Sequence, residues 1–352
     1  MIYYNNLNGC FCIKEYSSLV KNNLLEESST ILVGGYGGNV KTIDNKYIYN
    51  ITNASWMLKL NNNILMNDEH NSILYLIDSS NKTTLKTYPL QQLNTPVYFY
   101  LYNNIVYIAC YGDGSGNKAG ILTCDTNLGN VKEYVIANQS VNHIHCIDLF
   151  SYTDSSGYTK TCLIAVNLGD HNLYKIDPTN INFNTIVYTF PQKNGLDTNP
   201  RHFIQIPNTN KIVVITEEFN TELALLDYDG SKFNLVATYN LKQINPYITG
   251  AEIKYHNGTI YCTIRTYVSE FKDPYPYPDA SNGIFAKFTI DNNIFTLVSK
   301  VTVGKNPRYF TIYDNTAYIT NQESKNVMTV DIGSMGITKT YPIDNSCSFI
   351  LL

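Results

Sequence analysis

Residues 199–203, Asn-Pro-Arg-His-Phe, recur almost unchanged as Asn-Pro-Arg-Tyr-Phe at 306–310, which is 107 positions later. Each copy is followed by the same elements in the same order: an apolar strand, a turn, a second strand that ends in polar residues, and a third strand that ends in Asp. Weaker copies begin near residues 55, 96, 143 and 250, so the six units start roughly 40 to 60 residues apart. Units of this length with four short strands are typical of the blades of a β-propeller.

The units consist of short runs rich in β-branched and aromatic residues, separated by Asn, Gly, Asp and Pro. Runs such as 211–216 (KIVVIT) and 259–264 (TIYCTI) predict strands, and Asn257-Gly258 and Asn292-Asn293 predict hairpin turns between them. Helical periodicity is nearly absent. The sequence therefore predicts an all-β fold.

The two ends of the chain complete one further unit. Residues 345–352 resemble a lone first strand, and residues 29–52 resemble the missing second, third and fourth strands. If they join, the chain forms a seven-bladed β-propeller whose last blade is closed by N- and C-terminal strands, and the ring has no open edge. We therefore predict one propeller domain over residues 29–352, and an N-terminal extension over residues 1–28.

Composition excludes several classes of protein. Of the 352 residues 15% are charged and the net charge is −4, which argues against a nucleic-acid binder or a polybasic membrane-surface protein. No apolar run approaches the roughly 18 residues of a membrane span, and no secretory signal is visible. The eight cysteines form no CxxC pair and are interpreted as reduced thiols. We expect a cytoplasmic protein without a nucleic-acid or membrane partner, and the sequence leaves protein partners open.

The chain contains only three arginines, Arg201, Arg265 and Arg308, against 22 lysines. Arg201 and Arg308 lie at the start of a first strand and Arg265 at the end of a second strand, so all three are expected at one end of the central channel. A guanidinium is planar and binds a carboxylate or phosphate through two hydrogen bonds, which a lysine cannot do. We therefore predict an anion-binding site; the alternative is that each arginine binds loop carbonyls between blades.

Histidine and glutamate residues are predicted near the same end of the channel. His143 and His145 are two residues apart in a predicted strand, so their side chains share a face. For His143 the alternative is a side chain that only packs within the strand. A zinc site needs a third ligand, and no equivalent channel position offers one, so no metal site is predicted. One residue of the Glu217-Glu218 pair is expected to face the channel, either to orient a water or a histidine, or to brace an arginine.

Two other catalytic folds are excluded by their missing motifs. The sequence contains no GxSxG, and the glycines of residues 111–116 are interpreted as a hairpin rather than a turn before a helix. No βαβ pattern surrounds that stretch, so a nucleotide-binding fold is excluded as well.

Several short motifs, taken in order, resemble the seven-bladed lactonases, a family that includes propeller-type 6-phosphogluconolactonases and carboxymuconate-lactonizing enzymes. Pro-Arg-His-Phe at 200–203 with Thr-Glu-Glu-Phe-Asn at 216–220 resembles the family's "PRHF…NEL" signature. Gly-Gly-Tyr-Gly at 34–37, Asn-Asp-Glu at 67–69, His-Ile-His at 143–145 and Pro-Arg-Tyr-Phe at 307–310 resemble further family motifs. The matches run from about residue 30 to 350.

The resemblance implies a lactonase that needs no metal or cofactor and acts on a small anionic lactone, with 6-phosphogluconolactone as the expected substrate. Two alternatives stay open: a carboxymuconate-lactonizing activity of the same site, and a propeller that serves only for binding or as a scaffold. The implied catalytic residues are His145, Glu218, Arg201 and Arg265, and the expected substrate-binding residues are Arg308, His143, Asn321 and Gln322.

Overall fold

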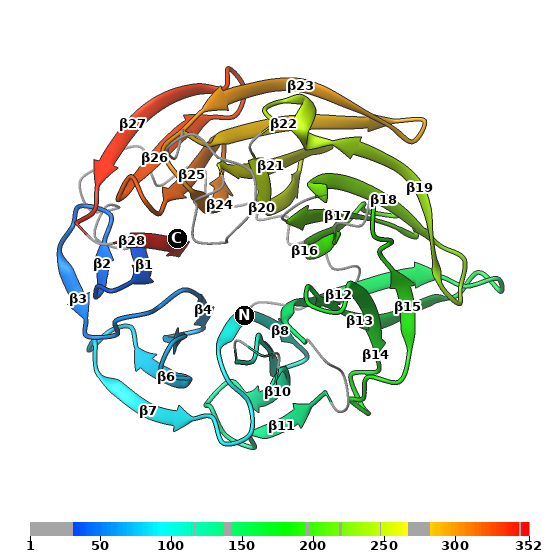
Figure 1. The fold of residues 1–352 in the computed structure, drawn as a ribbon. Coiled ribbons are helices and arrows are strands. Elements are labelled where there is room, and N and C mark those ends of the chain that lie inside the picture. Colours follow the sequence, from blue (N-terminus) through cyan, green and yellow to red (C-terminus); the bar gives the residue numbers. More distant parts are fainter. Residues whose placement is uncertain are drawn as a thin grey trace, which may run out of the picture.

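The computed structural model describes residues 31–113, 115, 117–136, 142–193, 197–217, 220–246, 248–266, 282–344 and 346–351. The predicted extension over residues 1–28 and the predicted catalytic residue Glu218 lie outside the described residues. Seven four-stranded antiparallel sheets are arranged as blades around a central channel (Figure 1). The prediction of an all-β, seven-bladed propeller is confirmed.

Blades are numbered here along the chain, and the strands of each are given from the channel outwards. Blade 1 comprises β28 (Ser346–Leu351), β1 (Leu32–Tyr36), β2 (Val40–Thr42) and β3 (Tyr47–Tyr49). Blade 2 comprises β4 (Met57–Leu60), β5 (Asn63–Asp68), β6 (Ile73–Asp78) and β7 (Thr84–Pro89). Blade 3 comprises β8 (Pro96–Tyr102), β9 (Ile105–Cys110), β10 (Gly120–Asp125) and β11 (Lys132–Val135). Blade 4 comprises β12 (Ile144–Thr153), β13 (Thr159–Asn167), β14 (Asn172–Ile176) and β15 (Ile186–Thr189).

The remaining three blades follow the same order. Blade 5 comprises β16 (Asn199–Gln205), β17 (Lys211–Glu217), β18 (Glu222–Tyr228) and β19 (Phe233–Asn240). Blade 6 comprises β20 (Ile248–His256), β21 (Thr259–Thr266), β22 (Ile284–Asp291) and β23 (Ile294–Thr302). Blade 7 comprises β24 (Pro307–Tyr313), β25 (Thr316–Asn321), β26 (Asn326–Asp331) and β27 (Gly336–Pro342). One turn of 3-10 helix, η3 (Leu241–Gln243), links blades 5 and 6.

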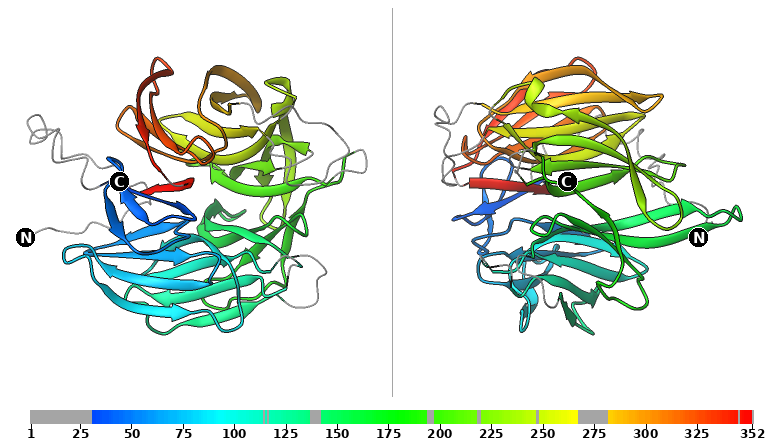
Figure 2. Two further views of the ribbon diagram at one scale, coloured as in Figure 1. Left: turned by 60° about the vertical axis from the view of Figure 1, so that its left-hand side comes forward. Right: turned by 45° about the vertical axis from the view of Figure 1, so that its right-hand side comes forward.

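Strands from both ends of the chain close the ring in blade 1, as predicted. The C-terminal strand β28 pairs with β1 from Leu32–Leu351 to Tyr36–Ser346 and is the strand nearest the channel (Figures 1 and 2). Its residues Cys347 and Ile350 are buried in a core shared with blades 2 and 7. Closure therefore also buries apolar surface, which stabilises the ring beyond the backbone pairing.

Adjacent blades pack through apolar side chains, and asparagines form many of the hairpin turns. Phe150 of blade 4 lies in one cluster with Phe203 and Val214 of blade 5. At the predicted turns Asn257, Asn292 and Asn293 have φ between 48° and 63°, a left-handed conformation that asparagine tolerates better than most residues. The described cysteines are all free and buried, whereas Cys10 and Cys12 lie outside the described residues.

A β-bulge recurs near the start of the inner strands and controls which side chains enter the channel. The pairing register skips one residue between Pro96 and Tyr98, and equivalent skips occur in β12, β16 and β24. In β20 the skip covers two residues, and in β28 it falls opposite Gly34 and Gly35 of β1. Bulges re-aim side chains. The residues skipped are Val97, His145, Arg201, Ala251 with Glu252, Arg308, and Ser348.

Trp56, just before β4, and four side chains that directly follow the bulges of β8, β16, β24 and β28 form an aromatic layer inside the channel. Trp56 contacts Tyr98, Tyr309 and Phe349, with ring centroids 4.4, 5.3 and 4.7 Å away, and His202 packs edge-on against Trp56 at 6.1 Å. We call these five residues the aromatic layer. It separates the channel into two mouths: an upper mouth, where β16 and β24 begin, and a lower mouth, where they end.

Candidate active site at the upper mouth

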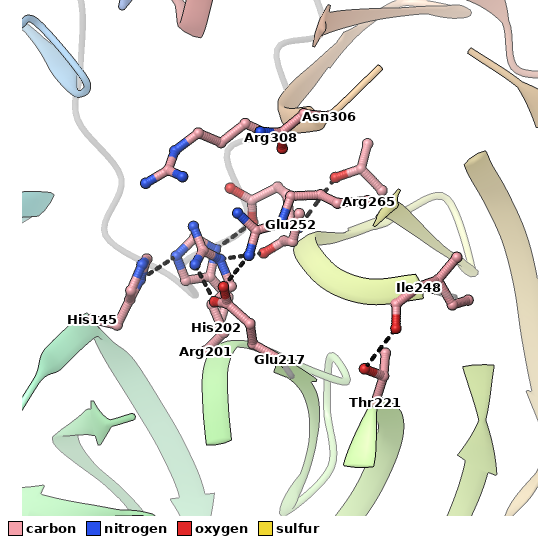
Figure 3. A network of polar contacts seen from close by, with 12 residues as sticks. His145, Arg201, His202, Glu217, Thr221, Ile248, Glu252, Arg265, Asn306 and Arg308 are labelled. Atoms are coloured by element: carbon pink, nitrogen blue, oxygen red, sulfur yellow. Dashed lines mark hydrogen bonds and ion pairs between the residues drawn. The ribbon is translucent and has the colours of Figure 1, made fainter. Parts of the chain in front are cut away.

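Arg201 and Arg265 share one carboxylate at the upper mouth. The bulge at the start of β16 turns Arg201 into the channel, and Glu217 and Arg265 come from the ends of β17 and β21 (Figure 3). Arg201 donates from Nη1 to one oxygen of Glu217, Arg265 donates from Nη2 to the other, and Arg201 Nε donates to the carbonyl of Ala251 at 2.9 Å. Arg201 therefore binds a backbone carbonyl of the neighbouring blade, as one alternative expected, although Ala251 lies in β20 rather than in a loop. The anion-binding site stays a prediction.

The charges of this cluster are strongly coupled because they are buried. Burial alone would raise the pKa of Glu217, but Arg201 and Arg265 outweigh that effect and lower it to about 2. Burial, with the nearby charges of Arg201 and Arg308, lowers the pKa of Arg265 to about 10. Both guanidiniums and the carboxylate are therefore charged at neutral pH.

Arg308 enters the same space from blade 7 with a different partner. Its Nη2 donates to the hydroxyl oxygen of Tyr36 at 3.0 Å, and its guanidinium lies 5.3 Å from the centre of that ring. The Tyr36 hydroxyl donates in turn to Glu69 Oε2 at 2.7 Å. Burial, together with Glu69, raises the pKa of Tyr36, so the phenol keeps its proton. Arg308 is thus oriented by a neutral group.

Among the described residues, the upper mouth carries more positive than negative charge. Three guanidiniums there face two carboxylates, Glu217 and Glu69, and the guanidiniums are close enough that each of Arg201 and Arg308 disfavours the charge on Arg265. Arg265 Nε is buried with no hydrogen-bond partner among the described residues. A buried donor without a partner is costly. The arrangement is therefore suited to bind an anionic ligand that supplies both charge and acceptor oxygens.

A chain of three buried side chains connects the upper mouth to the aromatic layer. His145 Nδ1 lies 3.0 Å from His202 Nε2, and His202 Nδ1 lies 2.9 Å from Glu252 Oε1 (Figure 3). All three residues are at most 5% exposed. Burial would raise the pKa of Glu252, but His202 and Lys254 lower it, so the carboxylate is ionised.

The chain determines the tautomer of each ring. An ionised carboxylate only accepts hydrogen bonds, so His202 carries its proton on Nδ1 and donates it to Glu252. Burial lowers the pKa of His202, so the ring is neutral and its Nε2 accepts from Nδ1–H of His145. Burial and the three arginines hold the pKa of His145 well below its usual value, and this ring is neutral too. Nε2 of His145 is therefore a free base.

A small cavity lies beside this base. It measures about 20 Å³ and is lined by residues that include His145, Arg201, Arg308 and Glu69. This volume is sufficient for one water molecule, and the lining offers both hydrogen-bond donors and acceptors.

The other residues predicted for the site lie near it without joining the arginine cluster. His143 is half-buried, stacks on Tyr111 at 4.0 Å and contacts the Tyr111 carbonyl through Nδ1 at 2.9 Å. Asn321 is fully buried at the end of β25, where its amide donates to Asn326 Oδ1 at 2.8 Å. Gln322 contacts Asn306. These contacts organise the edges of blades 4 and 7, and the predicted roles in substrate binding receive no support from them.

Of the Glu217-Glu218 pair, Glu217 is the residue that braces the arginines, which was one of the two expected roles, whereas Glu218 lies outside the described residues. Sequence reasoning missed four residues of the site: His202, which contacts Nδ1 of His145, and Glu252, Tyr36 and Glu69. His202 directly follows the bulge of β16 and Glu252 lies within the bulge of β20 in the neighbouring blade, so an alignment of the repeats at the bulge would have placed them close together. Tyr36 and Glu69 fall within motifs that were quoted for the resemblance alone.

In the described ranges, no group of three or more His, Cys, Asp or Glu side chains is arranged to hold a metal ion. Among the helices that the structure describes, none has the length and apolar character needed to cross a membrane.

Fold and site together define a seven-bladed propeller with a polar, arginine-rich site at one mouth of its channel. The sequence profile of the family described as "Lactonase, 7-bladed beta-propeller" matches residues 39–340. The chain therefore belongs to this lactonase family, as its motifs indicated. No curated protein sequence matches it significantly.

Solved structures agree with this fold at low sequence identity. A provisionally assigned 6-phosphogluconolactonase of Bacteroides fragilis is 16% identical, with a TM-score of 0.63 over 91% of this chain and 96% of that one. A provisionally assigned 6-phosphogluconolactonase of Bacteroides uniformis is 15% identical, with a TM-score of 0.64 over 91% and 98%. Hydrazine synthase of Kuenenia stuttgartiensis also matches, at 11% identity and a TM-score of 0.60 over 82% and 86%. Such different proteins share the fold, so function has to be argued from the site.

Proposed function

We propose that the protein hydrolyses an anionic sugar-acid lactone, with 6-phosphogluconolactone as the substrate, to the open-chain acid. The observation that carries the proposal is the chain from Glu252 through His202 to His145, which leaves Nε2 of His145 unprotonated beside three arginines. Ester hydrolysis needs a base for water and positive charge for the developing oxyanion. The upper mouth provides both.

The arginines support the choice of a phosphorylated substrate. Arg308 and the orphan Nε of Arg265 offer donors to a phosphate, while Arg201 lies with His145 at the small cavity. In the proposed complex the phosphate lies at Arg265 and Arg308, and the lactone carbonyl lies at Arg201. A neutral lactone would leave the excess positive charge of the site uncompensated.

In the proposed reaction His145 acts first as a base and then as an acid. Its Nε2 takes a proton from water in the small cavity while the water oxygen adds to the lactone carbonyl, and Arg201 stabilises the resulting oxyanion. The carbonyl then re-forms, the ring C–O bond breaks, and the alkoxide leaving group takes the proton from His145. Binding of the phosphate offsets the arginine charges that lower the pKa of His145, so the bound substrate strengthens the base.

Initial rates on three substrates test the proposal. We expect hydrolysis of 6-phosphogluconolactone well above its spontaneous rate, with kcat/KM at least about 10-fold above that for unphosphorylated gluconolactone, since a charged hydrogen bond contributes roughly 1.5–3 kcal/mol. His145→Gln should abolish the enzymatic part, with an unchanged circular dichroism spectrum as the control. Turnover of a carboxymuconate instead would support the lactonizing alternative. No turnover of any of the three would support a binding or scaffold role.

A further inference from the structure

A large cavity lies at the lower mouth of the channel, on the other side of the aromatic layer from the arginines. It measures about 990 Å³, which is within the range of small-molecule binding pockets. The inner strands of blades 3, 4, 5 and 6 line it, together with β13. The proposed lactonase reaction leaves this cavity unused.

The wall of this cavity is preformed by contacts between blades 4 and 5. The hairpin of β12 and β13 projects beyond the neighbouring blades (Figure 2). Its Thr153 donates its backbone N–H to Asn210 Oδ1 at 2.8 Å, and Asn210 Nδ2 donates to the Thr153 carbonyl at 2.9 Å. Gln205 accepts from the Ser151 backbone N–H at 3.0 Å. A preformed pocket lowers the free-energy cost of binding, because its side chains and loops need not be ordered when the ligand binds.

Charged groups line the inner end of the cavity. Glu252 Oε1 binds His202, whereas Glu252 Oε2 is buried with no hydrogen-bond partner in the described part of the chain. Asp148 lies in the wall, where it interacts with the hydroxyl groups of Tyr98 and Tyr100. Lys254 lies between the carboxylates, and its Nζ donates to the Tyr309 hydroxyl at 3.3 Å. The cavity thus offers two carboxyl groups and one ammonium.

Five tyrosines also line the cavity. Tyr98, Tyr100 and Tyr102 alternate along β8, so all three side chains lie on the face that lines the cavity. Tyr152 of β12 and Tyr255 of β20 line it as well. A tyrosine offers an apolar ring face together with a hydroxyl group.

We propose that the lower cavity binds a neutral polyhydroxylated molecule, a sugar or a polyol. Carboxylate oxygens accept hydrogen bonds from ligand hydroxyl groups, Lys254 donates to them, and the tyrosine rings pack against the C–H faces of a sugar ring. The two carboxyl groups disfavour an anion, and the ammonium of Lys254 disfavours a cation. The proposal does not require the lactonase function, because the ligand would lie on the other side of the aromatic layer from the arginines. The two sites nevertheless share His202 and Glu252, which line this cavity and also orient His145.

Binding of maltose, glucose, glucose 6-phosphate and choline to the full chain tests this inference. Isothermal titration and saturation-transfer NMR should detect maltose or glucose, with weaker or no binding of glucose 6-phosphate and choline at this mouth. Tyr100→Ala should weaken sugar binding by at least about 10-fold, because it removes a ring face and a hydroxyl group. Asp148→Asn should weaken it less. Tyr313→Ala is the matched control, since Tyr313 is 51% exposed and does not line the cavity.

The outcomes separate the proposal from its alternatives. Loss of sugar binding in Tyr100→Ala with unchanged hydrolysis of 6-phosphogluconolactone would support a second site. Sugar binding that Tyr100→Ala leaves intact would place the sugar elsewhere and overturn the proposal. Binding of glucose 6-phosphate or choline that is tighter than binding of glucose and that Tyr100→Ala weakens, or no sugar binding at all, would also overturn it. A parent protein that does not hydrolyse the lactone but binds the sugar, with that binding lost in Tyr100→Ala, would contradict the proposed function alone.

Discussion

Nδ1 of His145 and Nε2 of His202 lie 3.0 Å apart, although the two residues are 57 positions apart in the chain and belong to different blades. Both positions are set by a bulge at the start of the inner strand. His202 accepts the Nδ1 proton of His145 and so fixes the tautomer of that ring, which leaves Nε2 of His145 as the base. Glu252 in turn fixes the tautomer of His202. In the proposed reaction these two are positioning residues.

Substitutions at His202 should separate orientation of the base from substrate binding. His202→Phe fills the aromatic layer but removes the acceptor for His145, and we expect kcat to fall roughly 10- to 100-fold with little change in KM. His202→Gln offers an acceptor to His145 and a donor to Glu252, so it should retain more activity than the phenylalanine variant. Steady-state kinetics over a range of pH values would measure both. Equal loss in the two variants would contradict the role in orientation.

Lysine substitutions at two arginines should have different consequences. Arg308 contacts the phenol of Tyr36, whereas Arg201 is 4% exposed and bound to both Glu217 and Ala251. Arg308→Lys should therefore lower kcat/KM roughly 10- to 100-fold with little loss of stability, because about one charged hydrogen bond is lost. Arg201→Lys should lower both kcat/KM and the melting temperature. Turnover and thermal unfolding on the same samples test this, and an unaffected kcat/KM in Arg308→Lys would contradict anion binding there.

Glu217→Gln should destabilise the fold, because it leaves two buried guanidiniums without their shared carboxylate. We expect a loss of about 3 kcal/mol at pH 7. The pKa of Glu217 is lowered from 4.5 to about 2, so its contribution is present above about pH 4.5 and is lost as the pH falls towards 2. Urea unfolding of both proteins at several pH values measures this. The two stabilities should converge in acid, and a constant difference between pH 5 and pH 2 would contradict the assignment.

Asp148→Asn should show the opposite dependence on pH. Burial raises the pKa of Asp148 from 3.8 to about 7, so the folded protein holds a proton that the unfolded chain releases, and stability falls as the pH rises from about 4 to 7. The variant lacks this group, so its unfolding free energy should rise relative to that of the parent by up to about 4 kcal/mol across that range, since each unit of difference in pKa corresponds to about 1.4 kcal/mol. Urea unfolding at pH 4, 6 and 8 would test this. No improvement with rising pH would contradict a protonated Asp148.

Deletion of residues 346–352 should open the ring. The deletion exposes the edge of β1 and removes the buried residues Cys347, Phe349 and Ile350, so we expect aggregation rather than a soluble monomer. A synthetic peptide of residues 346–352 added during refolding should restore solubility, because it can pair with β1 in the same register. Size-exclusion chromatography and light scattering measure both effects. A truncated chain that stays soluble and unfolds cooperatively would contradict the need for closure.

The propeller and the location of its candidate site could be read from the sequence because both depend on local patterns. Each blade repeats one order of strands and turns, so the repeats predict the blade, its number of copies and the completion of blade 1 from the two ends of the chain. The same repeats place Arg201 and Arg308 at equivalent strand starts, and equivalent positions in a closed ring face one channel.

The contacts within the site depended on the tertiary structure. The bulges change which side chains of the inner strands face the channel, by a skip of one residue in β12 and β16 and of two residues in β20. This change brings His145 to His202 and His202 to Glu252. No strand pattern shows that Glu217 holds Arg201 and Arg265 together, because the three side chains come from three strands in two blades. The lower cavity could not be predicted from a strand pattern either, because the residues that line it beside Asp148 and Lys254 come from four neighbouring blades. Strand order is encoded locally, whereas burial and charge at the channel exist only once all seven blades surround it.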